Sequence, residues 1–384
     1  MFDLVNIFLN LSKSIKLRFL SELITKLSNF LIVIVITRSL GIEDYAFYVI
    51  LLTIIYGILP FLSLGLNSTI IKKLSSINDT DEITEKIFNC LKLIFLFFLS
   101  LLIITFFFLS FQFKENLLIG VLILISSFSI SLQMIFFEVL RSKYLSNNFS
   151  YLQILDSILF LALLIVMYEI KFMNIELILI VFIIVKIFIS ASIFLILKRK
   201  SIIKLNLTRQ PTNLIKNYIK PGIIFVILGI SDWFINFSDK LIIGYYLDSL
   251  QLSVYFTIGL ISSSILSLGS IYWWELLPKL NEYQSKNQYY KIFKLIKDRN
   301  ESFIYLSNIL IIILIIFSPL IQGLMLNENI ELEIFFYLFF FMSIFFHQIS
   351  TGWEFFCYIE DKSSFVLKNS VFWGIFSFVL YFIL

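Results

Sequence analysis

Charged and amide side chains recur at helical spacing inside two strongly apolar stretches. The stretch KLRFLSELITKLSNF carries three such residues four apart, namely Arg18, Glu22 and Lys26. The stretch GISDWFINFSDKLIIGYY repeats this spacing and adds one carboxylate, with Asp232, Asn236, Asp239 and Lys240. Residues four apart share one helix face, and a charge inside a bilayer costs about 2.5–3.5 kcal/mol on insertion scales. We therefore predict two polar helix faces that line one hydrophilic cavity. The alternative interpretation is that the charges pair within the bundle and only fix helix packing.

Four further ionisable residues lie inside apolar stretches. Asp156 and Lys186 are predicted either to pair with each other or to project into the cavity, and the sequence leaves both open. His347 and Glu354 are seven residues apart and share a helix face. A proton relay is one interpretation of that pair, and a histidine that hydrogen-bonds a neighbouring helix is the favoured one.

Enzyme chemistry has little support in the sequence. The two cysteines and the single histidine exclude a cysteine-based zinc site and a multi-histidine centre. Neither G-x-S-x-G nor a P-loop lysine motif occurs. We predict no catalytic residues, no metal and no cofactor. The candidates for proton or sodium coupling, or for charge pairing in the cavity, are Glu22, Asp156, Asp232, His347 and Glu354.

The composition defines the class of protein that must position these residues. Of 384 residues, 59% are apolar and only 15% are charged, with a mean hydropathy of +0.96. Soluble domains are nearer 25% charged, so a soluble enzyme and a nucleic-acid-binding domain are excluded. A membrane helix needs roughly 20 apolar residues, and the runs are too long for barrel strands. We predict an all-α polytopic membrane protein whose spans lie near 17–38, 45–66, 88–111, 117–140, 151–169, 175–197, 218–247, 252–278, 302–325, 333–358 and 363–384.

The basic residues predict the orientation of these spans. With a cytoplasmic N-terminus, the inside segments hold 22 of the 30 Lys and Arg residues, and the outside loops hold only Lys114 and Lys171. Cytoplasmic loops carry such an excess of positive charge. The longest basic inside loop follows the sixth span, so we predict an N-terminal lobe at 1–200, a cytoplasmic linker at 201–217 and a C-terminal lobe at 218–384. Two halves that start on the same side are related by an axis along the membrane normal.

Two segments resemble signatures of a known family. The exit of the first span reads VIVITRSLGIEDYAFYVI, with Arg38 before Leu-Gly, an acidic residue and an aromatic. The region of the seventh and eighth spans reads SDKLIIGYYLDSLQLSVYFTIGLI, with Asp239, Lys240, Gly244 and Tyr255 in the corresponding pattern. These segments, the WWELLPKL segment and the topology resemble the Wzx-type O-antigen flippases, the polysaccharide-transport branch of the MOP flippase superfamily.

The resemblance implies a function and a site. Such proteins are expected to carry undecaprenyl-diphosphate-linked oligosaccharide across the bacterial inner membrane by alternating access between two lobes around a central cavity. Expected partners are this lipid-linked glycan, membrane lipids, and a polysaccharide polymerase with its chain-length regulator, with no nucleic acid. The family has twelve spans, whereas eleven are predicted here. Residues that match the signature are Arg38, Asp239 and Lys240, and cavity electrostatics adds Lys26 and Lys186 as headgroup donors.

Two other functions remain open at this stage. One is a multidrug exporter of the same superfamily, coupled to protons or sodium. The other is a lipid-dependent membrane glycosyltransferase or polymerase, in which Glu43 and Asp44 after the first span are the acidic pair. The short outside loops argue against the second function, because such enzymes need room to hold an acceptor.

Overall fold

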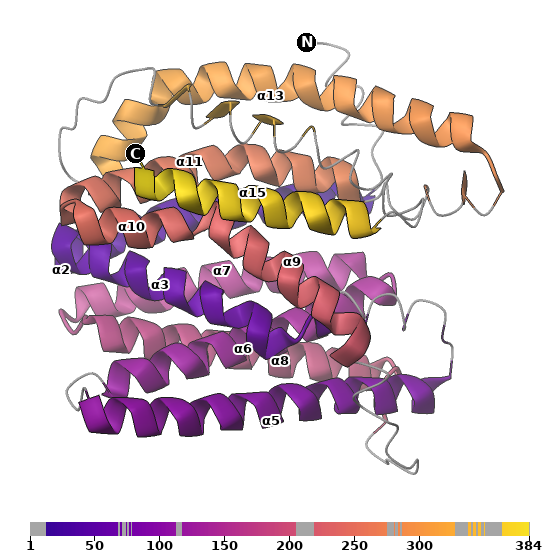
Figure 1. Cartoon of the computed structure of the whole chain (residues 1–384), viewed down its shortest axis with the longest axis horizontal. Coiled ribbons are helices and arrows are strands. Elements are labelled where there is room, and N and C mark those ends of the chain that lie inside the picture. The colour runs from indigo at the N-terminus through magenta and orange to yellow at the C-terminus, as the bar shows by residue number, and fades with distance from the viewer. Residues whose placement is uncertain are drawn as a thin grey trace. The chain divides into compact units, whose positions relative to one another are not determined.

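In the computed structural model, the regular secondary structure of the described residues is helical (Figure 1). The structure describes residues 13–67, 80–112, 117–204, 219–274, 286–326 and 363–383, with single positions at 70–79, 280–284 and 337–349. Within this part of the chain, eight helices are long and apolar enough to cross a membrane. The predicted all-α polytopic class is confirmed. The expected span at 333–358 falls largely outside the described residues.

The chain divides into two compact units. One comprises Met1–Ala46 and Ile243–Phe372, and the other comprises Phe47–Ile242 and Trp373–Leu384. Each unit therefore contains segments from both halves of the sequence. The predicted lobes at 1–200 and 218–384 follow chain connectivity instead, and that division stays a prediction.

The first unit is built around three long helices. They are α2 (Lys13–Leu40), α11 (Ser249–Trp274) and α13 (Tyr289–Leu326), and each contacts the other two. Small polar side chains join them, as is common between membrane helices. The Thr37 hydroxyl of α2 donates to the Met325 carbonyl oxygen of α13 at 2.6 Å. The first predicted span is therefore bound to helices from the far half of the sequence.

The second unit contains four helices that follow one another along the chain (Figure 1). They are α5 (Thr80–Gln112), α6 (Leu117–Ser142), α7 (Ser146–Glu169) and α8 (Ile175–Arg199), and α6 contacts the other three. The buried face of α6 is rich in serine, which lets neighbouring backbones approach. The Ser127 hydroxyl donates to the Ile55 carbonyl oxygen of α3 (Ile42–Ser63) at 3.1 Å. This bond ties α3 to the same unit.

Helix α3 and the turn that follows it pack against α9 (Lys220–Asn236) at several glycines, and we call this contact the α3–α9 seam. A Cβ atom on Gly65 would lie 2.3 Å from the Gly222 carbonyl oxygen, and one on Gly222 would lie 2.2 Å from the Leu64 carbonyl oxygen. Gly65 also has a φ of +64°, which side chains rarely adopt. Farther along, Gly229 faces Pro60. At Gly65 and Gly222, backbone therefore packs directly on backbone, which leaves no room for a side chain.

Candidate functional site

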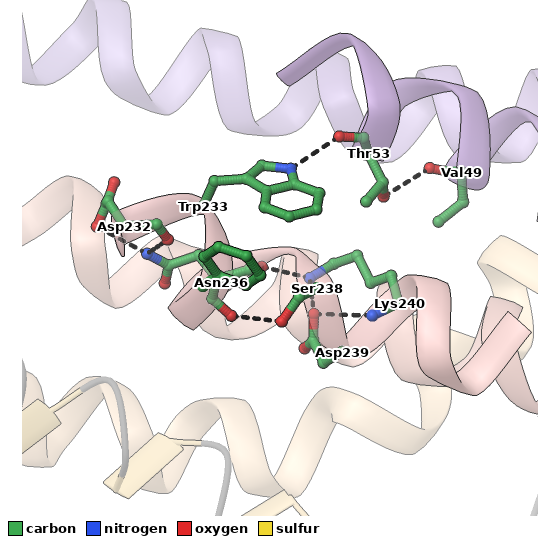
Figure 2. Close-up of polar contacts among 9 residues, drawn as sticks. Val49, Thr53, Asp232, Trp233, Asn236, Ser238, Asp239 and Lys240 are labelled. Carbon is green, nitrogen blue, oxygen red and sulfur yellow. Dashed lines mark hydrogen bonds and ion pairs between the residues drawn. The ribbon is translucent and has the colours of Figure 1, made fainter. Parts of the chain in front are cut away.

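The predicted seventh span is interrupted at Phe237. Helix α9 ends at Asn236, Phe237 has a φ of −135°, and α10 (Ser238–Tyr246) begins at the next residue. The sequence predicts one continuous span at 218–247, and no proline or glycine stands at the break. Irregular backbone inside a membrane must be satisfied by other groups or by water. At Phe237 itself, the N–H donates to the Trp233 carbonyl oxygen at 2.9 Å and the carbonyl oxygen accepts from the Lys240 N–H at 3.1 Å. The side chains of Ser238 and Lys240 bond the neighbouring carbonyl oxygens of Phe234 and Asn236 (Figure 2).

Two charged residues compensate the ends of the broken helix. The Lys240 ammonium donates to the Asn236 carbonyl oxygen at 2.5 Å, at the C-terminal end of α9. Asp239 stands in the first turn of α10, and its Oδ1 accepts from the Lys240 backbone N–H at 2.9 Å. A cation at a helix C-terminus and an anion at an N-terminus both complement the helix dipole. The two side chains also pair with each other at 3.1 Å, and both residues are buried.

A second polar group of α9 faces α3 across the α3–α9 seam. The Trp233 indole N–H donates to the Thr53 carbonyl oxygen at 2.9 Å (Figure 2). The ring of Trp233 lies against Gly57, where a Cβ atom would be 2.9 Å from the ring. One turn later, the Asn236 amide donates to Asp232 Oδ1 at 2.9 Å. The polar residues of this stretch thus serve both the helix break and the contact with α3.

Replacing Trp233 with phenylalanine is expected to destabilise the protein by about 1–2 kcal/mol. The variant loses the hydrogen bond to Thr53 and part of the ring that fills the space beside Gly57. Thermal unfolding of the purified protein in detergent measures this change. Replacement of exposed Trp373 by phenylalanine is the matched control. Equal melting temperatures for both variants would contradict the role of Trp233.

Asp156 and Lys186, for which the sequence left two interpretations open, pair with each other. Lys186 of α8 donates to Asp156 Oδ2 of α7 at 2.6 Å. The ammonium also lies 5.1 Å from the centre of the Phe182 ring, a cation–π distance. The sequence allowed either pairing or projection into the cavity, and the structure shows the two residues paired.

The polar face of the first span also forms local contacts. Arg18 and Glu22 form an ion pair at 2.6 Å. Lys26 donates instead to the Ser263 hydroxyl of α11 at 2.7 Å. Among the described residues, no carboxylate lies within ion-pair distance of Lys26. The prediction that this face and the seventh span line a shared cavity concerns both units, and it stays a prediction.

The remaining candidates are placed less centrally. Arg38 is exposed in the last turn of α2, where a cation complements the helix dipole. Glu43 and Asp44 are exposed in the first turn of α3, where negative charges complement the helix dipole. These positions give all three residues a structural reason to be there. His347 and Glu354 lie outside the described residues.

Some features of the site carry no clear sequence signal. The break at Phe237 lies in a stretch that contains no proline or glycine next to the break, and only its polar residues mark the place. Ser263 resembles the neighbouring serines of ISSSIL. Trp233 is conspicuous in the sequence, but its partner is a backbone carbonyl that composition cannot identify.

Known proteins resemble this chain in fold. No protein-family model matches the sequence, and no curated protein matches it. Solved structures do match. A MATE multidrug transporter, DinF-BH, in complex with a small molecule has a TM-score of 0.67 at 14% identity, covering 97% of this chain and 95% of that one.

Two further structures have similar coverage. An inward-facing multidrug resistance MATE transporter of the MOP superfamily has a TM-score of 0.59 at 16% identity, covering 96% of this chain and 87% of that one. A MOP superfamily transporter from Pyrococcus furiosus, whose binding pocket is described as having reverse polarity, has a TM-score of 0.57 at 14% identity, covering 97% and 95%. At these identities the likeness shows the fold. The chain has the fold of MATE transporters of the MOP superfamily.

Proposed function

We propose that this protein is an ion-coupled exporter of organic compounds in the bacterial inner membrane, with a cytoplasmic N-terminus. The main support is fold likeness over nearly the whole chain to structures described as multidrug transporters. One of them is described as inward-facing, which is one state of an alternating-access cycle. The carboxylates inside the spans offer groups that an ion gradient can act on. The multidrug exporter, raised as an alternative from the sequence, thus becomes the main proposal.

Efflux from cells tests this proposal. The full chain is expressed in a bacterial strain that lacks its own drug exporters, and loss of a fluorescent organic cation from preloaded cells is followed. We expect efflux faster than with the empty vector, and we expect a protonophore or a sodium ionophore to abolish it. Equal efflux with and without the protein, across cationic, neutral and anionic dyes, would contradict drug export.

A second candidate function is the flipping of lipid-linked oligosaccharide. The specific observation in its favour is Lys26, which binds a serine hydroxyl rather than a carboxylate within the described part of the chain. An ammonium that is not held in an ion pair is available to a phosphate group, which needs cationic donors in a low-dielectric site. The signature residues Asp239 and Lys240, by contrast, pair with each other.

In the flippase case, a deletion strain is expected to accumulate complete undecaprenyl-diphosphate-linked oligosaccharide and to lack surface polymer. Reintroducing Lys26→Met should fail to restore the polymer, because the phosphate loses a cationic donor. Lys92→Met is the control, since Lys92 is exposed on α5. Lipid extraction and surface-polysaccharide gels provide the measurement. An unchanged lipid pool in the deletion strain rules out this candidate and leaves drug export.

A further inference from the structure

Helix α8 has an exposed apolar stripe along one side. Its members are spaced four, three and four residues apart, namely Ile184, Phe188, Ala191 and Leu195, and all four are exposed. This spacing places them on one helix face. An exposed apolar face of a membrane helix lies against lipid tails, which are as apolar as leucine. We call these four residues the α8 stripe.

The α8 stripe ends in cations. Lys198 and Arg199 follow Leu195 by three and four residues, so they continue the same face, and Lys200 comes directly after them. All three are exposed. The 25 residues of α8 span about 37 Å, whereas the hydrocarbon core of a bilayer is about 30 Å thick. The three cations therefore stand at the level of the lipid headgroups.

Two of these cations have no acidic partner. Other cations at this end of the second unit are paired, namely Lys86 with Glu82, Arg141 with Glu138 and Lys204 with Asp81. Among the described residues, Lys198 and Arg199 have neither an ion-pair partner nor a hydrogen-bond partner. The helix dipole favours cations at a C-terminus, but it leaves their charged groups free to bind an anion.

The start of α7 adds to the positive charge at this place. The Lys200 ammonium donates to Asn148 Oδ1 of α7 at 3.3 Å, which places the first turn of α7 beside the end of α8. No side chain caps the N-terminus of α7, so its partial positive charge adds to that of the cations. One turn farther along α7, Tyr151 is 58% exposed. Tyrosine is enriched where membrane meets water.

We propose that the end of α8 predicted to be cytoplasmic binds an anionic phospholipid, with the phosphate at Lys198 and Arg199 and an acyl chain along the α8 stripe. Clusters of Lys and Arg at the cytoplasmic end of a membrane helix attract anionic lipids. The planar guanidinium of Arg199 can hold two phosphate oxygens at once. A soluble phosphate compound offers the same charge but leaves the α8 stripe uncovered, so the two features together favour a lipid.

This inference goes beyond the proposed transport function and holds for any exported compound. Because α8 contacts both α6 and α7, a lipid held at its end also stabilises the packing of the second unit. We therefore expect phosphatidylglycerol to raise the melting temperature of the wild type more than phosphatidylcholine with the same acyl chains does.

Native mass spectrometry of the purified full-length protein in detergent tests the inference. Phosphatidylglycerol and phosphatidylcholine with identical acyl chains are titrated into the wild type, the double variant Lys198→Gln with Arg199→Gln, and a control. The control is Lys294→Gln with Lys297→Gln, which makes the same change in charge at two exposed residues of α13, also on the predicted cytoplasmic side.

We expect the wild type and the control to bind phosphatidylglycerol about tenfold more tightly than phosphatidylcholine, and the double variant to lose this preference. Equal affinities of the wild type for the two lipids would overturn the inference. So would a folded double variant that keeps the wild-type affinity for phosphatidylglycerol. Displacement of the lipid by millimolar glycerol 3-phosphate would identify a site for soluble anions instead.

The single variants decide the matter if the double variant does not fold. Lys198→Gln and Arg199→Gln should each weaken phosphatidylglycerol binding by about threefold, because each removes one of the two cations. Unchanged binding by both would contradict the site. None of these readouts uses a transported compound, so failure of dye efflux would reject drug export and leave the lipid site standing.

Discussion

Gly222→Val is expected to remove nearly all correctly folded protein from the membrane. The new Cβ would lie 2.2 Å from the Leu64 carbonyl oxygen, and the atom in the way is backbone. A flexible side chain could move aside, but here α9 must move away from the backbone of the turn that follows α3. That separation would also weaken the Trp233–Thr53 hydrogen bond farther along the α3–α9 seam. We expect a loss of more than about 3 kcal/mol, the upper end for overpacking.

Gel filtration of the detergent-extracted protein, with its thermal unfolding, measures this effect. Ile223→Ala is the matched control, because the neighbouring side chain is 50% exposed and its truncation leaves the seam intact. Gly65→Ala should behave like Gly222→Val, since its Cβ would meet the Gly222 carbonyl oxygen at 2.3 Å and its φ is +64°. A monodisperse Gly222→Val protein with unchanged melting temperature would show that the two helices do not touch as described.

The second large effect concerns the charges at the helix break. Asp239→Leu and Lys240→Met are each expected to destabilise the protein by about 3–5 kcal/mol, because each breaks a buried ion pair by removing one of its two charges. The double variant should recover most of that loss, to within about 2 kcal/mol of the wild type. Removing both charges also removes the Lys240 bond to the Asn236 carbonyl oxygen, so recovery stays incomplete.

A double-mutant cycle of thermal or denaturant unfolding measures this coupling. Lys186→Met provides a comparison, since its pair lies on α7 and α8 and makes no bond to the break. Additive effects of the two single substitutions would mean that Asp239 and Lys240 act independently.

Much of the fold follows from the sequence because a bilayer restricts the choices. Backbone groups in hydrocarbon must be bonded within the segment, so a run of about 20 apolar residues has to be a helix. The described helices α2, α3 and α5–α8 overlap the first six predicted spans. The helix bounds differ by several residues from those of the predicted spans. Helix α5, for example, begins at Thr80, in the polar segment before the predicted span at 88–111.

The candidate site was only partly predictable. The i, i+4 spacing of Arg18 and Glu22 indicated a local ion pair, and the structure has it at 2.6 Å. Lys26 continues that spacing but bonds to a helix more than 200 residues away in sequence. For Asp156 and Lys186, the sequence left pairing and cavity exposure equally open. Partner choice between distant helices depends on packing, which local spacing does not encode.

By itself, the sequence determined that this protein is an all-α polytopic membrane protein, because hydrophobicity and segment length decide whether a helix spans a bilayer. It also identified the ionisable residues inside the spans. Only the tertiary structure decided that the turn after α3 meets α9 backbone to backbone, that the seventh span breaks at Phe237, and that Lys186 pairs with Asp156. These features arise where helices far apart in the chain come within a few ångströms of each other. Contacts of that kind are set by the shapes of both surfaces together.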